Sequence, residues 1–411
     1  MQSSSAWRVG ADVRAAARLG IGLSLLVALL GCGRVSGRSV AVAAPTSSLL
    51  YESPGQLSVA HVSPDSWKAL IWEWMPLLRE RDRANREGQA RGELRLLQFD
   101  LEQGRQMTLW HGPTPFCPTL LNTDVDADLR VAHVGNDVDR SFSPRSAVYI
   151  WDALELREPS VQATGWVGGV GAQPRWRPQG DAIAYMLKAW QQSGPEGPVR
   201  LMLLPVPRPA IPTQERAVPP RDSSVSDFAW SPDGRQLYVS YASESKHGIA
   251  VVQYPALRTE EFALPGEAFF LRAAHDSGDL VFAIYPSSSE HAGDHESPAA
   301  DIWRLSPAGR PERAMSVPHR WLHAMSLSPD GTLIALVPRQ SKMPSDTGLG
   351  VSVFGLADGL GHRLREFEDV PVASADWVSE GRALLVLGDN RMWLLDRANI
   401  VRGAARKRGR V

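Results

Sequence analysis

The chain has 411 residues and a formal net charge of −1, from 44 Lys and Arg against 45 Asp and Glu. With 43% hydrophobic and 22% charged residues, its composition is that of a globular protein and excludes a disordered chain, a collagen-like repeat and a polytopic membrane protein. The near-neutral charge argues against a dedicated nucleic-acid binder. Two Cys exclude a disulfide scaffold and a Cys-rich metal site.

The first thirty residues have the pattern of an export signal. Arg8, Arg14 and Arg18 precede an uncharged stretch, 19–30, of apolar and small residues. As a helix this stretch would be about 18 Å long, too short for a hydrocarbon core of about 30 Å. A positive segment before a short apolar one predicts a secretory signal peptide and not a membrane span.

The signal ends in Leu29-Leu30-Gly31-Cys32, which resembles the lipobox of bacterial lipoproteins. That resemblance implies cleavage after residue 31 and lipidation of Cys32, with membrane attachment through its acyl chains. Two or three chains on one residue anchor stably. The alternative is an ordinary cleaved signal in which Cys32 has no such role.

Two short segments are expected to flank the folded body. Residues 32–48 are rich in Gly, Ser, Ala, Val and Pro and predict a lipidated tether. Residues 401–411 form a basic tail with four Arg and one Lys. Residues 39–401, which contain the folded body, have 34 basic and 44 acidic residues. Because this part of the chain is acidic, we expect no nucleic-acid partner.

One short unit recurs along this body. Its fullest copy is Trp230-Ser231-Pro232-Asp233-Gly234 followed by an apolar strand that begins near Leu237. Pro fixes φ at the second turn position and Gly permits a positive φ at the last one, so the unit predicts a hairpin with an aromatic residue before a tight turn.

Six further copies follow the same pattern to different degrees. Ser328-Pro329-Asp330-Gly331 has Leu327 in place of the aromatic residue, and Trp176 and Trp377 open two partial copies. Three degenerate copies span 62–72, 122–133 and 275–284.

A second strand pair follows most hairpins, as at 94–104 and 301–309. Four antiparallel strands in each repeat predict the blade of a β-propeller, an all-β fold in which blades pack radially. We expect about seven four-stranded blades over 49–400, and the degenerate early copies leave six or eight as alternatives.

The Trp-Ser-Pro-Asp-Gly unit resembles the propeller repeat of TolB-like proteins. It is also similar to the repeat in the propeller domains of prolyl oligopeptidase-type peptidases. The resemblance implies the propeller architecture and, from TolB, protein contacts in the cell envelope. TolB has in addition a separate N-terminal α/β domain, for which we expect no counterpart here.

Known nucleophile and nucleotide motifs are missing from the sequence. It contains neither the Gly-x-Ser-x-Gly elbow of α/β-hydrolases nor a Gly-x4-Gly-Lys-Ser/Thr phosphate loop. We therefore expect neither of these enzyme classes, and no cofactor.

Two segments carry candidate metal ligands. His291, Asp294 and His295, with flanking Glu residues, could bind a divalent ion, but Gly293 and nearby Ser and Pro favour a solvated loop. Asp124, Asp126 and Asp128 alternate like the ligands of a calcium loop. They also align with the repeat turn, so a polar turn is the alternative.

Two other polar features have simpler interpretations. His319 and His323 would lie about 13 Å apart on one strand face, too far for one ion, which favours a surface pair. The run 78–92 carries charges of both signs and no apolar face, which predicts an exposed loop or a short solvated helix. Partner binding is the alternative for that run.

The sequence as a whole predicts a lipid-anchored propeller of the cell envelope that acts as a protein-binding scaffold on the periplasmic or extracellular face. Insertions at 75–93, 188–198, 285–299 and 339–349 are the expected recognition loops. One alternative is a purely structural or degenerate propeller with no dedicated ligand. The other alternative is a propeller enzyme of the lyase, lactonase or quinoprotein type. Such an enzyme needs a polar or metal site where several blades converge.

Overall fold

The protein is described by a computed structural model, in which the chain divides into two compact units, 1–44 and 45–411. All described residues belong to the second unit. They are 47–62, 67–76, 92–114, 123–126, 128–138, 144–152, 160–165, 174–191, 194–206, 216–218, 223–243, 246–285, 300–307, 309–319, 321–339, 348–359, 361–364 and 367–401.

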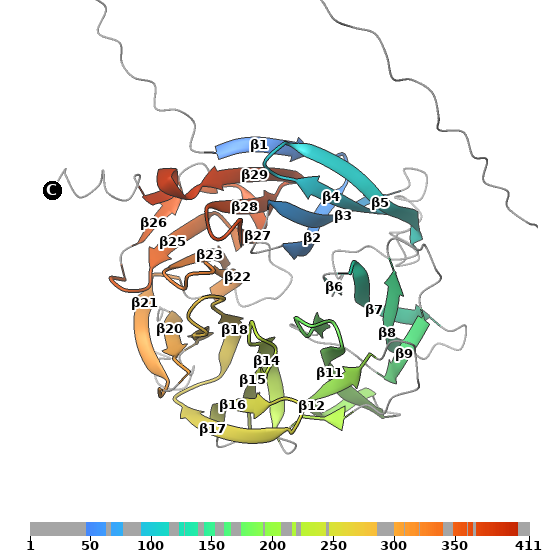
Figure 1. Cartoon of the computed structure of the whole chain (residues 1–411), viewed down its shortest axis with the longest axis vertical. Helices are drawn as coiled ribbons and strands as arrows, with labels where there is room; N and C mark the ends of the chain where they lie inside the picture. Colours follow the sequence, from blue (N-terminus) through green and yellow to red (C-terminus); the bar gives the residue numbers. More distant parts are fainter. Residues whose placement is uncertain are drawn as a thin grey trace, which may run out of the picture. The chain divides into compact units, whose positions relative to one another are not determined.

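Within this unit the structure consists almost entirely of antiparallel strands arranged around a common centre (Figure 1). Five sheets have four strands each, joined in sequence order. The first two comprise β2 (Gln56–Val62), β3 (Lys68–Pro76), β4 (Gly92–Asp100) and β5 (Arg105–Thr114), then β6 (Thr123–Val125), β7 (Arg130–Val138), β8 (Pro144–Asp152) and β9 (Ser160–Gly165). The next three comprise β10 (Arg175–Trp176), β11 (Ala182–Gln191), β12 (Gly194–Pro205) and β13 (Arg216–Ala217), then β14 (Ser224–Trp230), β15 (Gln236–Ala242), β16 (His247–Gln253) and β17 (Arg258–Leu264), then β18 (Ala268–Ala273), β19 (Leu280–Ile284), β20 (Ala300–Leu305) and β21 (Glu312–Val317).

The remaining strands form one nine-stranded sheet. It contains β22 (Trp321–Leu327), β23 (Leu333–Arg339), β24 (Gly348–Leu349), β25 (Val351–Gly355), β26 (Gly361–Leu364), β27 (Pro371–Val378), β28 (Ala383–Gly388), β29 (Arg391–Asp396) and β1 (Ser47–Glu52). The short β24 pairs with both β23 and β27 and so joins two four-stranded groups, β22-β23-β25-β26 and β27-β28-β29-β1. Apart from β24, the described strands therefore fall into seven groups of four, which we number as blades 1 to 7 from β2 to β29.

Blade 7 takes its outermost strand from the other end of the body. β1 pairs antiparallel with β29, with Ser47 opposite Leu395 and Glu52 opposite Arg391. This pairing makes Ser47 and Ser48, which lie inside the segment predicted as a tether, part of the propeller sheet. It also closes the ring, because β1 leads directly into blade 1.

Glu73 fixes that closure. Its carboxylate is 1% exposed and accepts hydrogen bonds from the hydroxyls of Tyr51 (2.7 Å) and Ser53 (2.5 Å), with the guanidinium of Arg95 3.5 Å away. Burial and the adjacent Glu73 raise the pKa of Tyr51 to about 12. The chain around β1 is thus bonded to blade 1 as well as to blade 7.

The hydrophobic core lies between neighbouring blades. One buried cluster joins Phe282 of blade 5 to Tyr238 of blade 4, and another joins Trp72 of blade 1 to Val131 of blade 2. The second strands are buried on both faces, as in Leu280–Ile284, which explains their continuous apolar sequences. The predicted all-β propeller architecture is confirmed.

The prediction of a loop at 188–198 is wrong. Residues 188–198 were expected to form a loop, but β11 and β12 continue as a hairpin in which Gln191 lies opposite Gly194. A register shift between Lys188 and Trp190 lets the ladder continue, so the backbone groups stay paired. Among the described residues, no helix is long and apolar enough to cross a membrane.

Candidate functional site: a polar layer on the first strands

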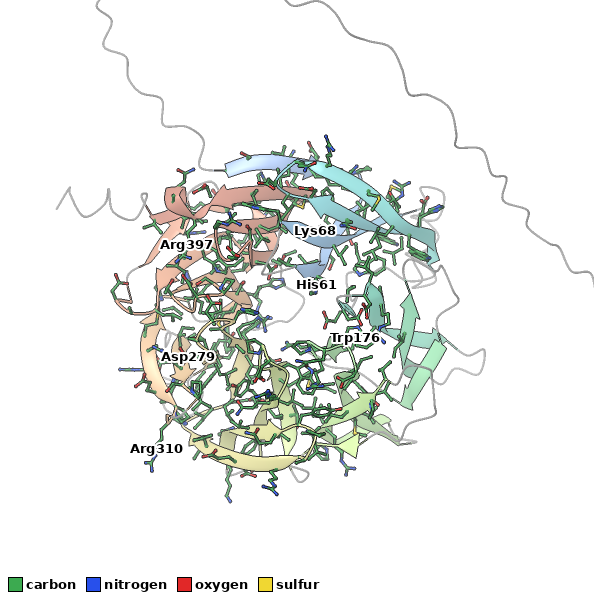
Figure 2. The ribbon with its side chains drawn as sticks, in the orientation of Figure 1. His61, Lys68, Trp176, Asp279, Arg310 and Arg397 are labelled. Carbon is green, nitrogen blue, oxygen red and sulfur yellow. The ribbon has the colours of Figure 1, made fainter. Side chains whose placement is uncertain are left out.

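Seven residues, one from the first strand of each blade, occupy equivalent positions in their sheets. In six blades this residue lies opposite the third residue of the second strand, as Arg175 lies opposite Ala184 and Asp376 opposite Leu385. In blade 5 it lies opposite the second residue. We call this set the polar layer. Its members are His61, Asp124, Arg175, Ala229, Arg272, Ser326 and Asp376. Figure 2 shows His61 and Trp176 close to the centre of the ring and Arg310 at its periphery.

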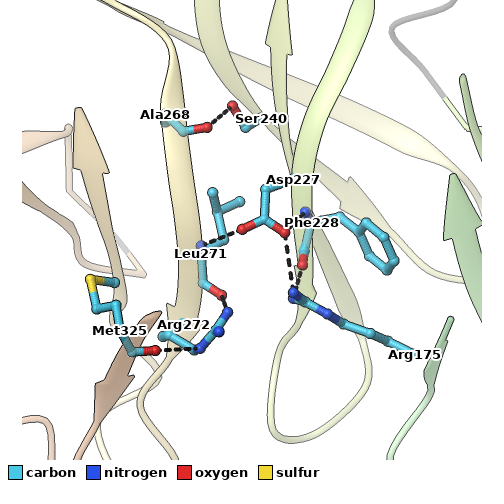
Figure 3. Close-up of polar contacts among 8 residues, drawn as sticks. All are labelled: Arg175, Asp227, Phe228, Ser240, Ala268, Leu271, Arg272 and Met325. Carbon is cyan, nitrogen blue, oxygen red and sulfur yellow. Dashed lines mark hydrogen bonds and ion pairs between the residues drawn. The ribbon is translucent and has the colours of Figure 1, made fainter. Parts of the chain in front are cut away.

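Arg175 bonds from blade 3 to blade 4. Its Nη2 lies 3.1 Å from Asp227 Oδ1, and its Nη1 donates to the carbonyl of Phe228 (Figure 3). The guanidinium also lies 4.9 Å from the centre of the Phe228 ring. Asp227 is only 6% exposed, so this ion pair belongs to the interior.

Asp227 extends the same connection to blade 5. Its Oδ2 accepts the backbone N–H of Leu271 at 2.8 Å, while Oδ1 also accepts the N–H of Phe228 at 2.7 Å. The layer position in this blade is Ala229, which has no polar group. Asp227 lies two residues earlier on the same strand face and supplies the missing contact.

Arg272 continues from blade 5 to blade 6. Its Nε donates to the carbonyl of Met325 at 3.0 Å and its Nη1 to the carbonyl of Leu271 at 2.9 Å (Figure 3). Burial, together with the neighbouring charge of Arg175, lowers the pKa of Arg272. The carboxylates of Asp227 and Asp376 oppose that effect.

Shorter side chains make the equivalent bonds elsewhere. Asp124 Oδ2 accepts the backbone N–H of Trp176 at 2.7 Å, and Ser326 Oγ accepts that of Trp377 at 3.3 Å. His61 Nδ1 lies 3.7 Å from Asp124 Oδ1. Each side chain thus reaches the first strand of the following blade, and the layer connects blades 1 to 7 in order.

The repeat turns form a second set of contacts, on one face of the ring. In blade 4, Ser231 Oγ donates to Asp233 Oδ1 at 2.7 Å, and Gly234 closes the turn with φ of 62°. Hydrogen bonds from the Ser231 hydroxyl and the Arg235 backbone lower the pKa of Asp233. In blade 6, Ser328 and Asp330 make the same bond at 2.6 Å, followed by Gly331 with φ of 70°.

Adjacent turns are bonded to each other. Arg177 donates to the carbonyl of Gly234 at 2.7 Å, and Gln179 donates to the carbonyl of Asp233 at the same distance. The backbone N–H of Asp276 donates to the carbonyl of Pro329 at 3.0 Å. Arg397 lies 2.8 Å from Asp330 Oδ2. Because these turns join first to second strands, the second-to-third connections leave the opposite face.

The other predicted residues of the repeat unit lie in or directly before these turns. Pro232 lies between Ser231 and Asp233 in the turn, half-buried. Trp176, Trp230 and Trp377 are buried before their turns. The guanidinium of Arg130 lies 4.6 Å from the Trp176 ring centre, and Trp230 Nε1 donates to the carbonyl of Arg175 at 3.2 Å.

The structure gives the aspartates of the calcium-like sequence separate partners. Asp124 accepts from Trp176, Asp126 pairs with Arg130 at 2.5 Å, and Asp128 donates its backbone N–H to Asp126 Oδ1 at 3.1 Å. His291, Asp294 and His295 lie outside the described residues, as do Cys32 and the basic tail. Across the described part of the chain, no group of three or more His, Cys, Asp or Glu is placed to hold a metal ion.

His319 and His323, which the sequence predicted to be a surface pair, lie in different structural settings. His319 precedes β22 and its Nε2 lies 3.1 Å from Ser352 Oγ, whereas His323 lies within β22. Burial and the charge of Arg363 lower the pKa of His319.

Sequence reasoning missed most of the polar layer. Arg175, Arg272 and Asp376, and Asp227 beside the layer, lie at least 45 residues apart, in strands with little sequence in common. Their position in the repeat could have revealed them. Each lies within three residues of the position before the turn, which is a Trp in the fullest copies of the repeat.

Comparison with known proteins identifies the fold. No family model matches the chain, and no curated protein matches its sequence. Hydrazine synthase of Kuenenia stuttgartiensis is similar in structure, with a TM-score of 0.52 and 13% identity over 89% of this chain and 99% of that chain. Oligogalacturonate lyase from Vibrio parahaemolyticus gives 0.54 and 12% over 85% and 92%. The chain is an all-β propeller. At these identities the similarity shows the fold alone.

Proposed function

We propose that this propeller is a protein-binding scaffold of a bacterial cell envelope, held at a membrane through lipidated Cys32. The observation that carries the proposal is the contrast between its two faces. On one face the repeat turns are short and bonded to each other, as Arg177 is to Gly234. The sequence between the second and third strands is much longer in two blades, after β3 (77–91) and after β19 (285–299).

This contrast supports different roles for the blades, which form a frame, and for the long connections, which bind a partner. Hydrogen bonds of the polar layer join consecutive blades, which favours a rigid frame. Long connections on a rigid frame are typical recognition elements, because the frame fixes where they begin and end. The resemblance of the repeat to that of TolB-like proteins supports an envelope protein as the partner.

Crosslinking in intact cells tests the scaffold. A photoreactive residue is placed in 285–299, and in a matched variant at Arg235, whose side chain is 80% exposed on the turn face. We expect one discrete envelope protein to be crosslinked from the insertion and not from position 235. Equal adducts from both positions, or none above background, would contradict the proposal.

The anchor is tested separately with Cys32→Ser. We expect the variant to leave the membrane fraction, because the lipid attachment site is lost. Unchanged partitioning would exclude lipidation at Cys32 as the anchor.

A second candidate is a propeller enzyme or ligand-binding protein with its site at the centre of the ring. The presence of Arg175, Arg272 and Asp376 in one layer, with Asp227 beside it, favours this candidate, since charged groups from several blades are what such a site requires. The hydrogen bonds by which Arg175, Asp227 and Arg272 join consecutive blades favour the structural role, and the scaffold therefore stands first.

A further inference from the structure

Four residues outside the polar layer lie together at one edge of blades 5 and 6. Phe269 is the second residue of β18, and Tyr285 directly follows β19, whose last residue pairs with Ala268. In blade 6, Trp321 begins β22 and lies opposite Arg339, the last residue of β23. All four therefore lie on the face from which the second-to-third connections leave. We call these four residues, without Ala268, the rim cluster.

The three rings of the rim cluster form a continuous row across the two blades. The ring centre of Tyr285 lies 5.3 Å from that of Phe269 and 5.0 Å from that of Trp321. The Tyr285 hydroxyl accepts the backbone N–H of Leu322 at 3.0 Å, which holds the central ring across the boundary between the blades. Residues directly opposite each other on paired strands have Cβ atoms about 5 Å apart, so Arg339 continues the row beside Trp321.

The core supports this row from one side. Tyr285 packs against the buried cluster between blades 5 and 6. Phe269 and Trp321 flank Tyr285 and are themselves half-buried, so part of each side chain reaches the surface. The row is therefore fixed in position by the fold and still presents apolar surface to solvent.

Arg339 differs from the arginines of the polar layer. Arg175 and Arg272 donate from their guanidinium groups to acceptors in the next blade. Within the described ranges Arg339 makes no ion pair, and its Nε is shielded from solvent without a hydrogen-bond partner. Burial raises the pKa of Tyr285, against the opposing influence of the Leu322 N–H and of the Arg339 charge. A half-buried guanidinium that joins no blades favours an anionic group on whatever binds beside it.

The angles between the rings distinguish among apolar groups that could bind there. The ring planes of Phe269 and Tyr285 make an angle of 41°, and those of Tyr285 and Trp321 an angle of 57°. The row thus has no common flat surface of the kind on which a sugar ring stacks. Tilted rings offer both faces and edges, which suit the offset and edge-to-face contacts of another aromatic side chain.

From this arrangement we propose that the rim cluster binds an aromatic side chain and a neighbouring carboxylate in a peptide segment of the partner protein. The aromatic side chain packs against Phe269 and Trp321, and the carboxylate accepts hydrogen bonds from the terminal N–H groups of Arg339. Two expected recognition insertions begin at Tyr285 and Arg339, so a partner that contacts them comes close to the cluster. The partner is the one that the scaffold function requires, and the assignment rests on that function.

Peptide selection tests the chemistry. The probe is a phage-displayed library of random heptapeptides, selected on the full chain in detergent. We expect the enriched peptides to carry Trp, Tyr or Phe next to Asp or Glu, and a synthetic copy of the most enriched one to bind with a Kd at or below about 1 mM by fluorescence anisotropy. No enrichment, or enrichment of peptides without this pair, would overturn the proposal.

Changes in the selected peptide test both groups on the unaltered protein. Replacing its carboxylate by the amide, or its aromatic residue by Ala, should each weaken binding at least about tenfold. These measurements do not depend on whether any variant of the protein folds. Equal binding of the acidic peptide and the amide peptide would exclude a role for the charge.

A double-mutant cycle then locates the carboxylate. Arg339→Gln should weaken the acidic peptide at least about tenfold and leave the amide peptide nearly unchanged, whereas Trp321→Ala should weaken both. Trp303→Ala, at a half-buried position in β20, and Arg313→Gln, which removes an exposed pair with Asp301, are the matched controls and should weaken neither. Equal effects of Arg339→Gln on the two peptides would overturn the assignment.

Crosslinking separates the rim cluster from the scaffold function. In cells, Arg339→Gln should reduce the adduct formed from a photoreactive residue in 285–299. An unchanged adduct would exclude the rim cluster and leave the scaffold in place. Absence of the adduct in the wild type would contradict the scaffold function, and the assignment would fail with it.

Discussion

Tyr51 donates a hydrogen bond of 2.7 Å to Glu73, and that bond joins the strand that completes blade 7 to the second strand of blade 1. The acceptor is almost fully buried and ionisable, so its contacts must satisfy it. Ring closure therefore depends on a few polar groups as well as on backbone pairing.

Tyr51→Phe is expected to lower the free energy of unfolding by about 1.5–3 kcal/mol, because a hydrogen bond to a buried charged group is lost. Urea denaturation of the full chain measures this. Glu52→Gln on the same strand removes only an exposed pair with Arg391 and should change stability much less. An equal effect of the two substitutions would contradict the role assigned to Glu73.

Asp227→Asn should destabilise the protein by about 3 kcal/mol, because the half-buried Arg175 would keep its charge without its counterion. The matched change Asp233→Asn alters an exposed turn carboxylate and should cost far less. Thermal unfolding of both variants checks the difference. A small effect at Asp227 would show that the layer does not hold blades 3 to 5 together.

Gly234 and Gly104 offer a matched pair, since both have φ of 62°. Substitution by Ala should cost each about 1–2 kcal/mol from the left-handed backbone. At Gly234 the added Cβ would also overlap the end of Gln179 and lie 3.1 Å from Arg177, whereas at Gly104 it meets nothing within 4 Å. We expect Gly234→Ala to be the more destabilising in urea; equal losses would mean that contacts between turns add nothing.

Acid should weaken the contact between blades 6 and 7. Burial acts to raise the pKa of Asp330, but hydrogen bonds from Ser328, Thr332 and Arg397 prevail and lower it from 3.8 to about 2. The stabilisation is present above pH 3.8 and lost as the pH falls toward 2, because the unfolded chain takes up the proton first.

Urea unfolding across that range tests the assignment. The advantage of the wild type over Asp330→Asn should shrink as the pH falls from 3.8 toward 2. Arg397→Gln removes one donor and should move the loss to higher pH. A constant difference between wild type and Asp330→Asn would show that Asp330 has no depressed pKa in the folded state.

The architecture could be predicted because its signals are local. The turn around Gly234 and the strand after it lie within fifteen residues, and their repetition indicates a propeller without any knowledge of long-range contacts. The hairpin at 188–198 was missed because its Gly and Pro residues resemble a loop, although the ladder continues through a register shift.

The candidate site depends on distance in space and could not be predicted in the same way. Arg175 and Asp227 are 52 residues apart and meet only because two blades pack side by side. Asp124 was read as one member of an alternating acidic series, yet its partner is a backbone group of the next blade, Trp176. No spacing within one segment carries that information.

The pairing of β1 with β29 also has a mechanical consequence. The chain that precedes Ser47 continues from the outer strand of blade 7, so any pull on it loads the β1–β29 ladder before any other part of the ring. The bonds of Tyr51 and Ser53 to Glu73 would share that load with blade 1. A tether attached here would pull on the seam where the two ends of the body meet, and that seam would be the first part of the propeller to open under force.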